Sequence, residues 1–175
     1  MNNLNFIFNR KSIRKYTGKI IEDEKMDQLL HAAMAAPSAR KQDPWRFIVV
    51  QDSEKLQEIK KILTNGQFVD QAGTAIIVLG DIKVAWDNSL EYMLQDCSAA
   101  IQNILLAAAE LELGTCWLGV QPKEDRIKGL KKLFNLPENI IPVAAIAVGY
   151  PDGEVAFKSR YNDKYVHYNQ WEKSK

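Results

Sequence analysis

The chain has 175 residues, enough to bury a hydrophobic core in one compact domain without disulfides or a structural metal. Its 23 Lys and Arg nearly balance 22 Asp and Glu, so the net charge of +1 argues against nucleic-acid binding through overall charge and leaves any anion site to local clusters. Cys97 and Cys116 are too few for a disulfide framework or a zinc ligand set, and we expect a reducing, cytoplasmic location.

Helical and strand-like segments alternate along the chain, and no repeat, low-complexity tract or linker separates them. The first pattern in chain order predicts a helix over residues 22–34, where apolar side chains recur at helical spacing until Pro37 ends it. Short apolar or β-branched runs at residues 47–50, 74–79 and 143–148 predict buried strands.

A long helix is predicted over residues 90–113, with apolar residues along one face and alanines around it. At about 1.5 Å per residue it would span about 35 Å, which is long for a domain of this size. Its surface is either partly covered by a second subunit or buried in the core of a monomer, and the periodicity fits both. The longest unbroken apolar run, residues 104–109, is far shorter than the roughly 20 residues of a spanning helix, so we expect no membrane insertion.

The last part of the chain has a charged segment, residues 123–134, and then a tail rich in aromatic residues. A helix is predicted over residues 123–134, ended near Pro137. The tail, residues 151–175, is polar and aromatic with little periodicity, so it must dock against other structure to be ordered. We therefore expect a single domain over residues 1–175.

Basic residues gather near both ends of the chain. The two groups are Arg10, Lys11, Ser12 and Arg14 near the start, and Lys158 and Arg160 near the end. A phosphate monoester needs several charge-assisted donors, which guanidinium and ammonium groups supply, and a serine hydroxyl adds a neutral one. Taken singly, each group is more typical of a solvated surface than of a binding site.

Two connecting segments are candidates for binding. Residues 36–45 leave a helix and enter a strand, and this segment is either a site loop or a plain connection. Residues 114–119 follow the long helix as a loop, in which Gly114 suits a helix cap and Gly119 suits close approach of a ligand to the backbone. Cys116 is expected to be buried and inert, because no base is paired with it.

The sequence lacks the residues that several kinds of site require. The glycines form neither a dinucleotide-binding fingerprint nor a phosphate-binding loop ending in Lys and Ser or Thr. Only His31 and His167 are available, so neither a metal site nor a Ser-His-acid triad is supported. If the chain is an enzyme, a bound cofactor is expected to carry the reaction.

Motifs along nearly the whole chain resemble those of the FMN-dependent nitroreductase family. They are Arg10-Lys-Ser-Ile-Arg14, Pro37-Ser-Ala39, Pro44-Trp45, residues 99–108 followed by residues 113–119, Gly149-Tyr-Pro151 and Lys158-Ser-Arg160. The resemblance implies an α+β fold with a mixed, mainly antiparallel sheet flanked by helices. It also implies a homodimer with the long central helix at its interface, residues 151–175 reaching over the partner, and two FMN sites between the subunits.

The resemblance also implies which residues hold the cofactor. The phosphate would lie among Arg10, Lys11, Ser12, Arg14, Lys158 and Arg160; the ring would be approached by Pro37, Ser38 and Ala39 of the other subunit, by Leu118 and Gly119, and by Asn65. Family members commonly have Asn and Gln before Pro-Trp, where this chain has Lys41, Gln42 and Asp43. Either Lys41 donates to the flavin or to an anionic substrate, or Gln42 takes over that contact.

By resemblance, the function is oxidoreduction with NAD(P)H as a transient donor. Hydride would pass to FMN and then to a nitroaromatic, a quinone or another small electron-poor acceptor, in ping-pong order and without a catalytic side chain of the protein. A specialised relative, such as a reductive dehalogenase or a flavin-destroying enzyme, is a second interpretation. A non-catalytic flavin-storage or sensing protein is a third, and a dimeric scaffold without cofactor is a fourth.

Overall fold

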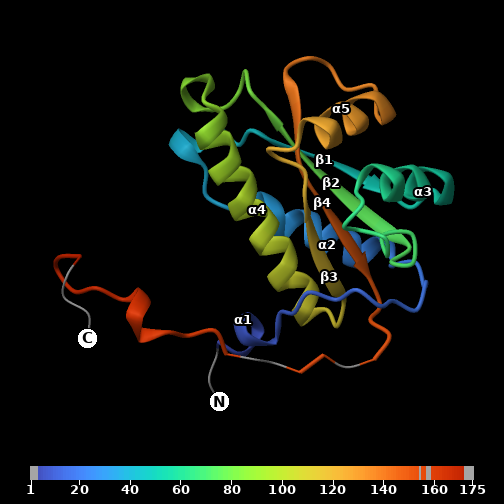
Figure 1. The fold of residues 1–175 in the computed structure, drawn as a ribbon, viewed down its shortest axis with the longest axis horizontal. Helices are drawn as coiled ribbons and strands as arrows, with labels where there is room; N and C mark the ends of the chain where they lie inside the picture. The colour runs from blue at the N-terminus through green and yellow to red at the C-terminus, as the bar shows by residue number, and fades with distance from the viewer. Residues whose placement is uncertain (1–3, 154, 157–158, 172–175) are drawn as a thin grey trace.

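The computed structural model of the protein describes residues 4–153, 155–156 and 159–171, and it has an α+β fold (Figure 1). The strands are β1 (Trp45–Val50), β2 (Thr74–Asp81), β3 (Gly114–Gly119) and β4 (Ile140–Gly149). The helices are α1 (Asn5–Asn9), α2 (Asp23–Met34), α3 (Ser53–Ile62), α4 (Leu90–Glu110) and α5 (Glu124–Leu133), with 3-10 turns at Ala39–Lys41 (η1), Trp86–Asn88 (η2) and Asp163–Tyr165 (η3).

The four strands form one sheet in the order β1-β2-β4-β3, and each of its pairings is antiparallel. The expected mainly antiparallel sheet is therefore confirmed. A parallel pairing occurs outside these strands, as an isolated bridge between Ser12 and Thr115. This bridge lies along the outer edge of β3 and fixes the position of the N-terminal segment.

Helices cover both faces of the sheet. Side chains alternate along β2, so that Ile76 and Val78 join the core beneath α2 and α4, whereas Ala75 and Ile77 join the core beneath α3 and α5. The strand is buried on both faces, which explains why its sequence is a continuous apolar run instead of an alternating one.

The long central helix is shorter than expected. α4 begins after Ser89, whose hydroxyl accepts the Tyr92 amide, and it ends at Glu110 instead of residue 113. The chain turns at Glu112, which has a φ of 60°. Gly114 is therefore not the helix cap, and its lack of a side chain has another cause: a Cβ there would lie 2.9 Å from the Ile13 side chain.

Two further elements differ from the expectation. Residues 114–119 form strand β3 and not a loop. The segment 53–62, for which no element was predicted, is helix α3, and the Asp52 carboxylate caps it by accepting the Lys55 amide.

The N-terminal segment is held between β3 and the end of β4. The Ile13 amide donates to the Thr115 carbonyl at 2.8 Å, the Thr17 amide to the Tyr150 carbonyl at 3.0 Å, and the Asp152 amide to the Lys15 carbonyl at 3.0 Å. The two ends of the chain consequently run side by side below the sheet, and the tail then extends away from the body (Figure 1). None of the helices in the described ranges combines the length and apolar character needed to cross a bilayer.

A polar cluster fastens the start of α2 to this same junction. Glu22 accepts hydrogen bonds from Lys19 at 2.8 Å and from the Tyr150 hydroxyl. The Lys19 ammonium and then the Tyr150 hydroxyl hold the pKa of Glu22 at about 2, well below its ordinary 4.5. Lys25 also donates to the Tyr150 hydroxyl and to the Leu111 carbonyl at the end of α4.

Candidate functional site

The two basic groups of the sequence meet in one pocket. A cavity of about 450 Å³ is lined by Arg10, Lys11, Ser12 and Arg14 from the N-terminal segment and by Ser159, Arg160 and Tyr161 from the tail, with Ile7, Phe8, Val155 and Ala156 as its apolar walls. Lys158, the remaining expected member, lies outside the described residues. The register of the N-terminal segment on β3 brings these residues together, although they are almost a chain length apart.

The pocket is an uncompensated positive site. Among the described residues, none of its Arg and Lys side chains takes part in an ion pair. Four cations without a carboxylate repel one another, and this repulsion favours binding of an anion. A phosphate monoester, with several acceptor oxygens and about two negative charges, matches such a donor set.

The outer edge of β3 leads away from this pocket. Because Thr115 directs its carbonyl outward to Ile13, strand alternation also directs the backbone of Trp117 and Gly119 outward. Four residues of strand place Gly119 about 13 Å from Thr115. One edge of β3 thus has the basic pocket at one end and Gly119 at the other, where the Gly119 carbonyl accepts a hydrogen bond from Arg126 Nη1 at 2.6 Å.

Expected ring contacts lie at the Gly119 end of β3. The Leu118 side chain is only 1% exposed and belongs to the core, so only its backbone could reach a ligand. Asn65 is exposed in the turn after α3, and the next residue, Gly66, packs so closely on Leu118 that a Cβ there would lie 2.6 Å from its Cδ1. The structure therefore places Asn65, Leu118 and Gly119 near one another.

The segment from Pro37 to Gln42 lies elsewhere in the same chain. The Ala39 amide donates to Asp96 Oδ1 at 2.9 Å, in the first half of α4. Asp96 and Glu110, at the far end of α4, are about 20 Å apart along the helix axis. Within one chain, none of the segment's Pro37, Ser38, Ala39, Lys41 and Gln42 lines the basic pocket. Lys11 of that pocket also lines a second cavity, beside the end of α4 and the start of β3.

The loop that departs from the family pattern is closed by its own hydrogen bonds. The Ser38 hydroxyl donates to Asp43 Oδ1 and accepts the Asp43 amide at 3.1 Å. Arg40, Lys41 and Asp43 have φ values of 53°, 59° and 49°, a conformation that is uncommon outside glycine and that often marks functional loops. Arg40 also lies over the Trp86 ring, 5.3 Å from its centroid.

Asp96 was not expected to matter beyond interrupting an apolar helix. It is 6% exposed, and its Oδ2 atom has no hydrogen-bond partner among the described residues. A half-satisfied buried carboxylate is costly. In the sequence, the signal that could have revealed Asp96 is a single acidic residue on the apolar face of the predicted long helix.

The cysteines are buried thiols. Burial raises the pKa of Cys97 to about 12, and it also raises the pKa of Cys116, although the Arg14 guanidinium acts in the opposite direction. The expectation that Cys116 is buried is confirmed, and a raised pKa disfavours its thiolate form. Within the described ranges, no three His, Cys, Asp or Glu side chains gather as a metal site would require.

Comparison with known proteins gives the family. The model of the nitroreductase family matches residues 7–81 and 61–150. The chain belongs to the nitroreductase family. It is 43% identical over 171 residues to "Putative NADH dehydrogenase/NAD(P)H nitroreductase" of Archaeoglobus fulgidus, covering 96% of this chain and 98% of that protein.

Solved structures of the family share the fold. An FMN-dependent nitroreductase from Clostridium difficile superposes with a TM-score of 0.87 at 32% identity, covering 95% of this chain and 99% of that one. The NADPH:FMN oxidoreductase of Vibrio harveyi, solved in complex with NAD⁺, gives 0.86 at 25% identity, covering 100% of this chain and 80% of that one.

Proposed function

We propose that this nitroreductase-family protein is an FMN-dependent oxidoreductase that takes electrons from NAD(P)H and passes them to a small electron-poor acceptor such as a nitroaromatic or a quinone. The observation that carries the proposal is the meeting of basic residues from both chain ends in one pocket beside β3. When bound, FMN supplies the hydride chemistry, so no nucleophile or base of the protein is required.

The residues present fit this cofactor. Arg10, Lys11, Ser12, Arg14 and Arg160 would hold the phosphate, and the sequence-based expectation adds Lys158. At the other end of β3, a Cβ at Gly119 would meet only the Gln121 carbonyl, at 4.0 Å, so packing within the chain does not require a glycine there. The space left by the missing side chain at this position suits the face of a planar ring.

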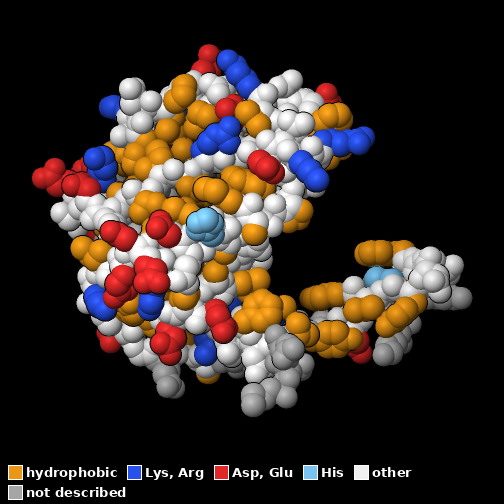
Figure 2. Space-filling model, turned by 180° about the vertical axis from the view of Figure 1, so that it is seen from behind, with side chains coloured by type: hydrophobic (Ala, Val, Ile, Leu, Met, Phe, Trp, Pro, Cys, Tyr) orange, Lys and Arg blue, Asp and Glu red, His pale blue; other side chains and the backbone are white. Residues whose placement is uncertain are grey.

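We also propose that the protein acts as a homodimer. A groove of about 600 Å³ runs along α4, where Phe6, Ala32, Ala35, Leu106 and Ala107 are its apolar lining. Beyond the basic pocket the tail extends away from the body of its own chain (Figure 2). It carries Tyr165 and Trp171, which are 79% and 80% exposed. A second copy would cover both surfaces, and the Pro37–Gln42 segment would then reach the partner's flavin.

The proposed turnover is ping-pong, with donor and acceptor using one pocket in turn.

Both cysteines are free thiols, which suits a reducing, cytoplasmic compartment.

The test starts from purified protein supplied with FMN or with riboflavin. We expect tight binding of FMN, clearly weaker binding of riboflavin, and oxidation of NADH or NADPH that requires a quinone or a nitrofuran. Parallel lines in double-reciprocal plots would support ping-pong order. Bound FMN without any turnover would favour the storage or sensing alternative, and failure to bind FMN would refute the assignment.

A further inference from the structure

The side chain of Arg126 reaches from α5 to the end of β3. Its Nη1 atom donates to the Gly119 carbonyl at 2.6 Å, and the side chain is partly buried there. Among the described residues, Arg126 forms no ion pair. One positive charge therefore lies against the Gly119 peptide without a compensating carboxylate.

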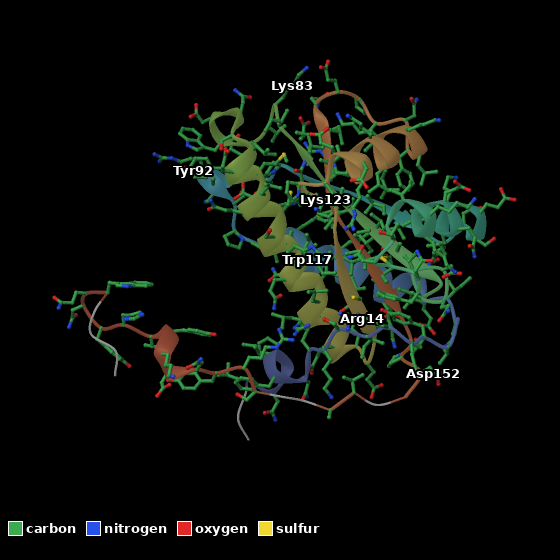
Figure 3. All side chains as sticks on the ribbon, in the orientation of Figure 1. Arg14, Lys83, Tyr92, Trp117, Lys123 and Asp152 are labelled. Atoms are coloured by element: carbon green, nitrogen blue, oxygen red, sulfur yellow. The ribbon has the colours of Figure 1, made fainter. Side chains whose placement is uncertain are left out.

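The peptide that Arg126 binds lies at the end of β3, the edge strand of the sheet. Packing requires a glycine at position 114, where Ile13 is in contact, but not at position 119, where the nearest atom to an added Cβ is 4.0 Å away. After Gly119, the Val120 and Gln121 amides both donate to the Val143 carbonyl and end the strand. Figure 3 shows Trp117 of β3 on the side of the sheet that α4 borders, between Arg14 below and Lys123 above.

We propose that Arg126 is a positioning residue for the flavin: it fixes the Gly119 peptide against the ring and provides a positive charge that favours the reduced cofactor. This inference rests on the proposed function. Hydride uptake brings two electrons and one proton from NAD(P)H, which leaves as NAD(P)⁺, so the ring gains one negative charge. A fixed cation nearby stabilises that state more than the oxidised one.

The test measures the midpoint potential of bound FMN by equilibration with a reference dye, in the wild type and in Arg126→Met. Methionine has a similar length but neither charge nor donor. We expect the variant to lose about tenfold in its preference for reduced over oxidised FMN, which corresponds to a midpoint about 30 mV more negative for a two-electron couple. Arg126→Lys should restore most of the potential, because it keeps the charge.

Lys128→Met is the matched control. Lys128 lies on the same helix, its side chain is 78% exposed and it pairs only with Glu124, at 3.4 Å. Its removal takes away one charge without touching Gly119, so the potential should stay at the wild-type value. Apo-protein melting curves report any general loss of stability separately.

Each outcome either supports or overturns the proposed role of Arg126. Equal potentials in Arg126→Met and Lys128→Met would overturn the role of Arg126 while leaving the proposed function intact. A lowered melting temperature with an unchanged potential would show a structural role only and would also overturn it. If the Met variant does not fold, the potentials of Arg126→Lys and Arg126→Gln are compared instead. Wild-type protein that binds no FMN would refute both this proposal and the proposed function.

Discussion

Arg14 allows the phosphate pocket to be tested by a thermodynamic comparison of two ligands. We expect Arg14→Met to weaken binding of FMN but not of riboflavin, which has the same ring and no phosphate. A hydrogen bond to a charged group contributes about 1.5–3 kcal/mol, or on the order of 10- to 150-fold in Kd. Arg14 is exposed and shares the pocket with other cations, so screening places the expected loss near the lower end, at about tenfold.

The assay is the quenching of flavin fluorescence during titration with apo-protein. Lys15→Met is the matched control, because Lys15 is adjacent and exposed but does not line the pocket. The wild-type dependence of FMN binding on salt should also be steeper than that of Arg14→Met, since a phosphate contact is lost. The reasoning would be refuted if FMN and riboflavin were weakened by the same factor, or if Lys15→Met had the larger effect.

Three further results are expected. Gly149→Ala should lower the free energy of unfolding in urea by about 1–3 kcal/mol, because the new Cβ would collide with the backbone of Ala72, and an unchanged midpoint would contradict this close approach. The pKa of Glu22 in the fold, about 2, lies below its ordinary 4.5, so Glu22 stabilises the protein above pH 4.5 and this contribution is lost as the pH falls toward 2. Glu22→Gln should accordingly show a flatter fall of the urea midpoint across that range, and parallel curves for the two proteins would argue against the coupling. Replacing Tyr165 and Trp171 together by Ser should shift sedimentation toward the monomer, while an unaltered dimer would exclude the tail from the interface.

The core elements could be predicted because each has a strong local pattern. The helix expected at residues 22–34 is α2, and the buried strands at residues 47–50 and 74–79 are β1 and β2, each within a few residues. β3 was missed because a six-residue edge strand that begins and ends in glycine has the composition of a loop. α3 was missed although Asp52 offers a capping signal and its buried Leu56 and Ile59 lie at helical spacing.

The candidate site was only partly predictable. The sequence shows two basic groups but not that they meet, because their meeting depends on the pairing of Ser12 with Thr115 and of Lys15 with Asp152. Before the structure was considered, only the family resemblance placed the two basic groups in one phosphate site. Arg126 gave no signal at all, since its bond to Gly119 crosses from a helix to a strand end and follows no sequence motif.

Under the proposed function, the pocket between residues 7–14 and residues 155–161 also determines when the protein can acquire its cofactor. Residues 10–14 are synthesised before the sheet, and Arg160 is synthesised only after the last strand, β4. A nascent chain can form the sheet and its helices before the basic pocket is complete. Retention of flavin would then report that synthesis has passed Arg160, and chains that stop before this residue would be released without a full anion site.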